Sequence, residues 1–385
     1  MKSISSASLS SGTRVIVRAD FNMPVDESGK IRDTYRLDST KATLEFLVKA
    51  GAIVTIISHI ESEQDTLLPV VPYLKEMFPQ SAISFCADYG AEYVAASATS
   101  KPGDIILCEN LRLHEGEKAN DAVFAQSLTA FGDVYCNEAF SVSHRKHASV
   151  DALPKLYPGK AFAGMQFFKE IEALSKAAHA PAKPFVFILG GAKFDTKIPL
   201  LDKFSSRADT VMIAGALAHT VFKEKGYEMG ISLCADGSYD TKKYFERGNA
   251  LVPEEVVIQS ADKTSVRTGK PDSLAAGERI VDATPDSMDV LIPKLSEAQT
   301  IIWNGPLGSY EEGFVGGTVH LAELIHRHAP ASATTIIGGG DTVAVVQGIA
   351  PAGSFTLVST GGGAMLDYLV NETLPGIEAL DQANA

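Results

Sequence analysis

Short apolar runs alternate along the chain with longer segments in which apolar residues recur every three or four positions. In the first half, the apolar runs are residues 15–17, 53–57, 83–86, 105–108 and 134–136. The intervening segments, such as 41–51 and 120–132, have the periodicity of amphipathic helices. This alternation of strands and helices predicts a parallel sheet covered by helices.

The second half repeats the pattern, which predicts a second α/β domain. Its apolar runs are residues 185–189, 211–214, 256–258, 300–303, 334–337 and 355–358. Between the halves, FFKEIEALSKAAHA reads as a helix and APAKP as a short break. We therefore expect the following divisions: a domain over 1–168, a connecting helix or hinge over 169–183, a second domain over 184–368, and a C-terminal tail over 369–385.

The residues that follow the predicted strands differ between the two halves. Ligands of open parallel sheets bind beyond the carboxyl ends of the strands. In the first half these ends carry polar and charged residues, namely Asp20, Asn22, Ser58, His59, Asn110, Arg112 and Asn137. In the second half they carry glycine-rich turns at 190–191, 214–215, 304–306, 338–341 and 361–363. Because the strand ends of the two halves carry different kinds of residue, we expect the two halves to bind different ligands.

Glycine-rich turns let backbone N–H groups approach a phosphate closely. Lys193 and Lys197 follow one such turn and are four residues apart, so they share a helix face. Asp341 follows another turn and could hold Mg²⁺ on phosphate oxygens, or cap a helix. Glu311 could accept hydrogen bonds from ribose hydroxyls, or be a surface acid. The chain has no Walker-type loop and no dinucleotide-binding glycine motif.

Arg36, Arg112, Arg145 and His59 lie near strand ends of the first half, and arginine suits bidentate binding of carboxylate and phosphate. His144 and His147 flank one of these arginines, but no third ligand for a metal is evident.

The overall charge excludes some classes of protein. Acidic residues number 47 and basic residues 34, a net charge of −13, which argues against nucleic-acid binding. The four cysteines form no C-x-x-C pair, so we expect buried thiols rather than a zinc or redox site. No signal peptide or membrane span is evident, and we expect a soluble, cytoplasmic protein.

Seven stretches, in order and spanning nearly the whole chain, resemble phosphoglycerate kinase. They are VRADFNMP (17–24), ENLRLHEGE (109–117), NEAFSVSHRKHAS (137–149), LGGAKFDTKI (189–198), WNGPLGSYE (303–311), GGGDT (338–342) and STGGGAMLDYL (359–369). The resemblance implies two facing Rossmann-like domains joined by a hinge helix, with the tail packed on the N-terminal domain. It also implies a monomer that exchanges a phosphoryl group between 1,3-bisphosphoglycerate with MgADP and 3-phosphoglycerate with MgATP.

The resemblance also implies roles for individual residues. The phosphoglycerate ligands would be Asp20, Asn22, Arg36, His59, Arg112 and Arg145, with Arg36 also stabilising the transferring group. The nucleotide ligands would be Gly190, Gly191, Lys193, Lys197, Gly215, Asn304, Pro306, Glu311, Gly340, Asp341 and Thr342. Among these, Lys197 would contact the transferring phosphoryl group, and Asp341 would hold Mg²⁺.

Several residues depart from the family pattern at these sites, among them Ser141, Ala214 and Ala216, and two departures matter most. An arginine that usually helps to hold phosphoglycerate is replaced by Ser62, between Glu61 and Glu63. One lost charge-assisted contact costs about 1.5–3 kcal/mol, on the order of tenfold to a hundredfold in affinity. A glycine that usually lies against adenine is replaced by Thr284. Two alternatives therefore stay open: a diverged member with another acyl-phosphate substrate, and a catalytically weak binding module.

Overall fold

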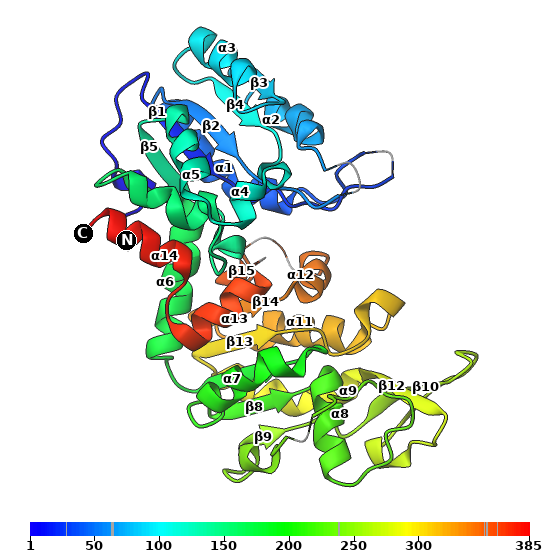
Figure 1. Ribbon diagram of the computed structural model, residues 1–385. Coiled ribbons are helices and arrows are strands. Elements are labelled where there is room, and N and C mark those ends of the chain that lie inside the picture. Colours follow the sequence, from blue (N-terminus) through cyan, green and yellow to red (C-terminus); the bar gives the residue numbers. More distant parts are fainter. Residues whose placement is uncertain (28, 63–64, 238, 350, 352, 360) are drawn as a thin grey trace. The chain divides into compact units, whose positions relative to one another are not determined.

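The computed structural model describes residues 1–27, 29–62, 65–237, 239–349, 351, 353–359 and 361–385 (Figure 1). Glu63, which the sequence analysis singled out, lies outside these residues. The chain divides into two compact units, Met1–Glu172 with Thr373–Ala385, and Ala173–Glu372. Helix α6 (Met165–His179) contributes residues to both units. No helix among the described residues is long and apolar enough to cross a membrane.

The first unit is built on a six-stranded parallel sheet in the order β3-β4-β2-β1-β5-β6. Its strands are β1 (Arg14–Arg18), β2 (Ile53–Ile57), β3 (Ile83–Cys86), β4 (Ile105–Cys108), β5 (Val134–Asn137) and β6 (Ala161–Ala163). All five apolar runs of the first half form strands, which confirms the predicted parallel α/β architecture. The sequence pattern missed β6, because three residues are too few to show a periodicity.

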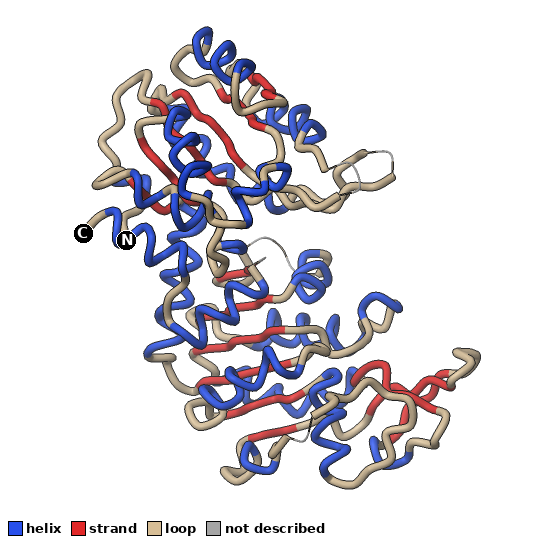
Figure 2. The backbone as a smooth tube through the Cα atoms, in the orientation of Figure 1, coloured by secondary structure: helices blue, strands red, loops and turns tan. Residues whose placement is uncertain are grey.

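Helices lie on both faces of this sheet (Figure 2). They are α1 (Tyr35–Lys49), α2 (Val71–Met77), α3 (Ala91–Thr99), α4 (Glu115–Lys118), α5 (Ala122–Leu128) and the C-terminal α14 (Pro375–Ala383). Under α1, Leu44 and Leu47 pack on Val15, Val17 and Val54, all of them fully buried. Each such side chain contributes about 1.5–3 kcal/mol by its burial.

The C-terminal helix α14 belongs to the first unit. The N–H of Gly376 donates to the carbonyl of Ser143 over 2.9 Å, and the N–H of Gly159 donates to the carbonyl of Ala383 over 2.7 Å. A Cβ atom at Gly376 would lie only 2.7 Å from Ser143 Cβ, so this contact requires glycine. The last residues of the chain therefore complete the same unit as the first ones.

The second unit also has a six-stranded parallel sheet, in the order β15-β14-β13-β7-β8-β9 (Figure 1). Its strands are β7 (Phe185–Leu189), β8 (Thr210–Ile213), β9 (Ala250–Leu251), β13 (Thr300–Asn304), β14 (Thr334–Gly338) and β15 (Leu357–Ser359). The surrounding helices are α7 (Phe194–Phe204), α8 (Gly215–Glu224), α9 (Pro285–Met288), α10 (Ile292–Glu297), α11 (Gly316–His328), α12 (Gly340–Gln347) and α13 (Gly362–Asn371).

The apolar run at 256–258 does not belong to the parallel sheet of the second unit, where we expected it. Residues 256–258 belong to β10 (Val256–Ser260), which lies in a separate antiparallel sheet with β11 (Val266–Gly269) and β12 (Glu278–Ala283). The turn between β10 and β11 is short and is closed by hydrogen bonds to Asp262 from Ser260 and Thr264. So short a connection permits only antiparallel pairing, because parallel strands need a longer crossover.

Helix α6 begins against a buried carboxylate of the first unit. The N–H groups of Gln166 and Phe167 donate to Glu138 over 3.2 and 3.0 Å, and that of Met165 donates to the hydroxyl of Thr43 over 2.7 Å. The Thr43 hydroxyl in turn donates to Glu138. These contacts satisfy the unpaired donors of the first helical turn. Burial raises the pKa of Glu138 to about 7, although the hydrogen bonds act in the opposite direction.

The raised pKa of Glu138 predicts a dependence of stability on pH. Above pH 4.5 the unfolded chain releases a proton that the folded protein keeps, so the contribution of Glu138 falls as the pH rises through about 7. We expect the unfolding free energy of wild type, minus that of Glu138→Gln, to fall by about 1 kcal/mol between pH 6 and pH 8. Urea unfolding followed by circular dichroism measures this difference.

Glu45→Gln is the matched control, because Glu45 is exposed on α1 and, among the described residues, forms its ion pair with Lys41 at 3.7 Å. Its effect should be small and the same at both pH values. An equal effect of Glu138→Gln at pH 6 and pH 8 would contradict the prediction.

Candidate active site

The strand ends of the first unit bring the predicted anion ligands to one edge. Because the strands are parallel and paired in register, Arg18 on β1 lies opposite Ile57 on β2 and Asn137 on β5. The segments that leave these strands carry Asp20 and His59. Both are buried, at 6% and 1% exposure.

Arg36 is held at this edge by a carboxylate. It lies on α1, and its Nη1 atom pairs with Asp20. The hydroxyl of Ser141 also donates to Asp20, and Arg36 Nη1 lies 3.4 Å from that hydroxyl. Asp20 therefore fixes the guanidinium while a quarter of the arginine side chain stays exposed.

His59 lies beside Arg18, a residue that the sequence analysis did not single out. Arg18 Nη2 donates to His59 Nδ1 over 3.2 Å, and Arg18 Nε donates to Ser149 over 2.9 Å. Burial, and then the charges of the surrounding arginines, lower the pKa of His59 strongly, so the ring is neutral and carries its proton on Nε2. An arginine at the end of an apolar strand was the signal that could have revealed Arg18.

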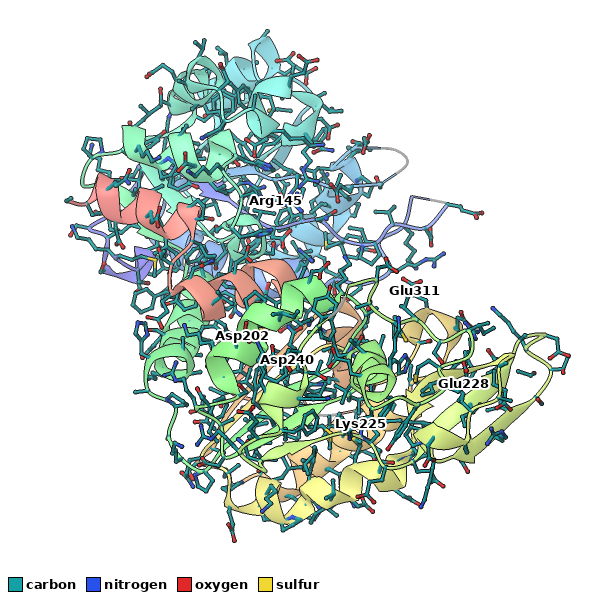
Figure 3. The ribbon with its side chains drawn as sticks, turned by 60° about the horizontal axis from the view of Figure 1, so that its bottom comes forward. Arg145, Asp202, Lys225, Glu228, Asp240 and Glu311 are labelled. Atoms are coloured by element: carbon teal, nitrogen blue, oxygen red, sulfur yellow. The ribbon has the colours of Figure 1, made fainter. Side chains whose placement is uncertain are left out.

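Arg112 and Arg145 add further positive charge. Burial, followed by the charges of Arg145 and Arg18, lowers the pKa of Arg112 to about 10. Burial, followed by the charges of Arg112 and Arg145, lowers the pKa of His147 to about 4. Arg145 is exposed and is labelled in Figure 3. Arginine charges that lower the pKa of Arg112 and His147 in this way favour an anion at this edge.

Glu61 contacts two of the residues predicted to bind phosphoglycerate, Arg112 and Asn22. Its carboxylate pairs with Arg112, and its N–H donates to Asn22 Oδ1 over 2.8 Å. Ser62 accepts a hydrogen bond from the N–H of Asp65 over 3.2 Å. Arg32 lines the same cavity as Glu61 and Ser62, and is a nearby cation that could offset the missing family arginine.

The glycine turns of the second unit pack on one another. The N–H of Gly190 donates to the carbonyl of Asn304 over 2.9 Å, and that of Gly191 to the carbonyl of Pro306 over 2.8 Å. Gly215 has a φ of 59°, and a Cβ atom there would lie 2.7 Å from Gly191 N. These glycines thus let three strand ends converge. Helices α8, α12 and α13 begin at this edge with Gly215, Gly340 and Gly362, and the first N–H groups of a helix have no partner within it.

Lys197 is buried beneath these turns. Its ammonium group contacts Asn304 Oδ1, and burial, followed by the charge of Lys193, lowers the pKa of Lys197 to about 7. Asn304 Nδ2 and Thr342 Oγ1 are buried and have no hydrogen-bond partner among the described residues. Both atoms are therefore free to make hydrogen bonds with a ligand at this edge.

A cavity of about 430 Å³ opens at this edge. Of the predicted nucleotide ligands, those that line it are Gly191, Gly215, Pro306, Glu311 and Asp341. The predicted ligands that do not line it are Gly190, Lys193, Lys197, Asn304, Gly340 and Thr342. One wall is apolar and contains Ile231 and Leu233, which are 54% and 61% exposed. Exposed apolar side chains inside a cavity are typical of a ligand-binding wall.

Two neighbouring glutamates at the cavity differ in their partners. Glu312 pairs with Arg279, and the ammonium nitrogen of Lys263 lies 3.5 Å from the Glu312 carboxylate. Glu311, labelled in Figure 3, makes no hydrogen bond or ion pair with any described residue. Its carboxylate is therefore available to a ligand.

Thr284 does not line the cavity. It is buried, and its hydroxyl lies 2.8 Å from that of Ser287 and 3.2 Å from the carbonyl of Glu255. Asp282, two residues earlier, accepts from the N–H of Gly317 at the start of α11 over 3.1 Å. The replacement of glycine by threonine is therefore accommodated by packing behind the cavity.

Asp341 is the residue that fits a magnesium ion. It lies exposed in the first turn of α12, lines the cavity, and makes no hydrogen bond or ion pair with any described residue. The described residues contain no group of three or more His, Cys, Asp or Glu side chains that could hold a metal. A single carboxylate suits Mg²⁺, which keeps several waters and is bound largely by substrate phosphates.

Comparison with known proteins places the chain in a family. A sequence model of the family described as "Phosphoglycerate kinase" matches residues 5–372. The phosphoglycerate kinase of Azorhizobium caulinodans is 37% identical over 385 residues, 96% of this chain and 96% of that protein. The one from Desulfosudis oleivorans is 37% identical over 400 residues, 99% of each chain.

Solved structures agree with these matches. Phosphoglycerate kinase from Coxiella burnetii has a TM-score of 0.83 at 30% identity, over 100% of this chain and 99% of that one. The enzyme from Pyrococcus horikoshii has a TM-score of 0.84 at 25% identity, with the same coverage. Matches of this extent do not favour a diverged substrate or a binding module. The chain belongs to the phosphoglycerate kinase family, phosphotransferases that use a carboxyl group as acceptor.

Proposed function

We propose that the protein transfers the terminal phosphoryl group of MgATP to the carboxylate of 3-phosphoglycerate, and catalyses the reverse reaction from 1,3-bisphosphoglycerate and MgADP. The observation that carries this proposal is the pair of strand edges built for different anions. One edge gathers four arginines around a neutral histidine, and the other combines a buried lysine, unpaired polar atoms and a cavity with an apolar wall.

Phosphoglycerate would bind at the edge of the first unit. Asp20 holds the Arg36 guanidinium in place, and Arg112 and Arg145 supply further charge for the phosphate and carboxylate groups. His59 would donate from Nε2, since its Nδ1 atom is occupied by Arg18. Asn22 would contribute its side-chain amide. Because Glu61 pairs with Arg112, the incoming anion would have to displace that carboxylate.

The nucleotide would bind in the cavity of the second unit. Its base would cover Ile231 and Leu233, and the ribose would meet the unpaired Glu311. The phosphates would lie towards Gly191, Gly215 and the start of α12, with Asp341 holding Mg²⁺. When bound there, Mg²⁺ would neutralise charge on the phosphate oxygens.

Transfer of the phosphoryl group needs positioning and positive charge more than covalent chemistry. Arg36 and Lys197 would supply that charge to the transferring oxygens. Lys197 is suited to this because its ammonium group is desolvated, and charge in a water-poor site acts more strongly. The lowered pKa means that phosphate binding would also stabilise its protonated form.

We further propose that the enzyme is a monomer of the cytoplasm, that it acts in glycolysis, and that α6 is the hinge between the two substrate sites. One chain carries both candidate sites, so no second copy is required. Helix α6 contributes residues to both units and is firmly capped at its start by Glu138.

The direct test is ADP formation from MgATP, with and without 3-phosphoglycerate, under conditions that remove the acyl phosphate product. We expect phosphoglycerate-dependent turnover on the order of 10–100 per second. Folded protein that binds MgADP but shows no such turnover would contradict the proposed acceptor.

Lys197→Ala tests the role of the buried ammonium group. Loss of a charge that acts on the transferring group should lower kcat by about 10²–10³-fold, while the Kd for MgADP should change by less than about tenfold. Steady-state kinetics and calorimetry measure the two quantities. Lys203→Ala is the control on the same helix, since Lys203 pairs with Glu372 at 2.8 Å, and it should leave kcat unchanged. Equal losses of kcat and affinity in Lys197→Ala would remove it from the transfer step.

Glu61→Gln tests whether the carboxylate competes with the substrate for Arg112. Glu61 is 61% exposed, so the ion pair is screened, and its loss should lower the KM for 3-phosphoglycerate about twofold to fivefold with kcat unchanged. Glu27→Gln is the control, because Glu27 lines the same cavity as Glu61 and the substitution removes the same charge. If both variants lower KM equally, the effect is general electrostatics; if Glu61→Gln has no effect, the substrate does not displace Glu61.

A further inference from the structure

One polar side chain in the apolar wall of the second unit's cavity has no role in the function proposed above. His219 lies on α8, four residues after Gly215, and lines the cavity with Ile231 and Leu233. It is only 7% exposed. The sequence analysis missed it, although a histidine one helical turn after a glycine-containing turn was a signal that could have drawn attention to it.

The hydrogen bonding of His219 fixes which of its ring nitrogens carries the proton. Its Nδ1 atom lies 2.8 Å from the carbonyl oxygen of Leu233. A carbonyl oxygen can only accept, so Nδ1 is the donor. Burial lowers the pKa of His219 to about 4, so the ring is neutral near pH 7. In a neutral ring with a protonated Nδ1, the Nε2 atom is a hydrogen-bond acceptor only.

The Nε2 atom of His219 is unpartnered but accessible. None of the described residues makes a hydrogen bond with this nitrogen. The nitrogen is also not one of the fully buried polar atoms that have no hydrogen-bond partner. It therefore keeps contact with solvent from a ring that is otherwise buried. The exposed side chains of Ile231 and Leu233 beside it offer an apolar surface of the kind that a planar base would cover.

We propose that His219 determines the base specificity of this site, with its Nε2 atom accepting a hydrogen bond from the exocyclic amino group of adenine. The inference rests on the proposed binding of a nucleotide in this cavity. Hypoxanthine carries a carbonyl oxygen in place of that amino group, so two lone pairs would face each other. Unsubstituted purine has neither group and would leave Nε2 without a partner.

Calorimetric titration of the full-length protein with three magnesium nucleoside diphosphates tests the proposal. We expect ADP to bind about twofold to tenfold more tightly than purine riboside diphosphate, the range for one neutral hydrogen bond. Inosine diphosphate should bind more weakly than either. This comparison needs no variant, and equal affinities of the wild-type protein for ADP and purine riboside diphosphate would overturn the proposal.

Two variants separate the hydrogen bond from the shape of the wall. His219→Phe keeps a ring but cannot accept, so it should bind ADP and purine riboside diphosphate with equal affinity. Ile231→Ala removes apolar surface only, so it should weaken the binding of both nucleotides and keep the wild-type preference. Circular dichroism verifies that each variant is folded.

The outcomes distinguish this inference from the proposed function. If His219→Phe retains the full preference for ADP, the base is read elsewhere and the proposal is overturned, while nucleotide binding stands. If folded wild-type protein binds none of the three diphosphates, the proposed function fails and the role of His219 fails with it.

Discussion

Both units depend on one constraint of parallel sheets, that every strand ends at the same edge. In the first unit this edge collects positive charge. Arg18 is almost completely buried there and is held by the hydroxyl of Ser149, which donates in turn to the carboxylate of Glu117. The burial that forms the sheet thus also desolvates the cations at its end. Their mutual repulsion is relieved by few acids, and an anionic substrate would relieve it further.

The second unit meets the same constraint in another way. Its strand ends approach so closely that side chains are excluded, and glycines at 190, 215 and 305 make the contacts. Lys197 is buried here, and its ammonium group contacts Asn304. The cost is that Asn304 Nδ2 and Thr342 Oγ1 have no hydrogen-bond partner among the described residues. In the first unit, by comparison, Asp20 and Glu61 supply carboxylates that pair with Arg36 and Arg112.

Most of the fold follows from local pattern. Five apolar runs of the first half and five of the second overlap strands of the two parallel sheets, because buried strands of parallel sheets are apolar on both faces. The run at 256–258 has the same composition but belongs to an antiparallel sheet, and the difference lies in the length of its connection. Edge strands such as β6 and β9 are too short to show any periodicity.

The sequence by itself determined the parallel architecture, the two kinds of strand edge and the residue types available at each. Only the tertiary structure decided what each side chain contacts. Glu61 pairs with Arg112 although its side chain stays largely exposed, and Thr284 bonds to Ser287 and Glu255 without lining the cavity. His219 has one nitrogen bonded to Leu233 and the other accessible. The physical reason is that the direction and ionisation of a side chain are set by burial and by neighbours distant in the chain, and a local pattern carries neither.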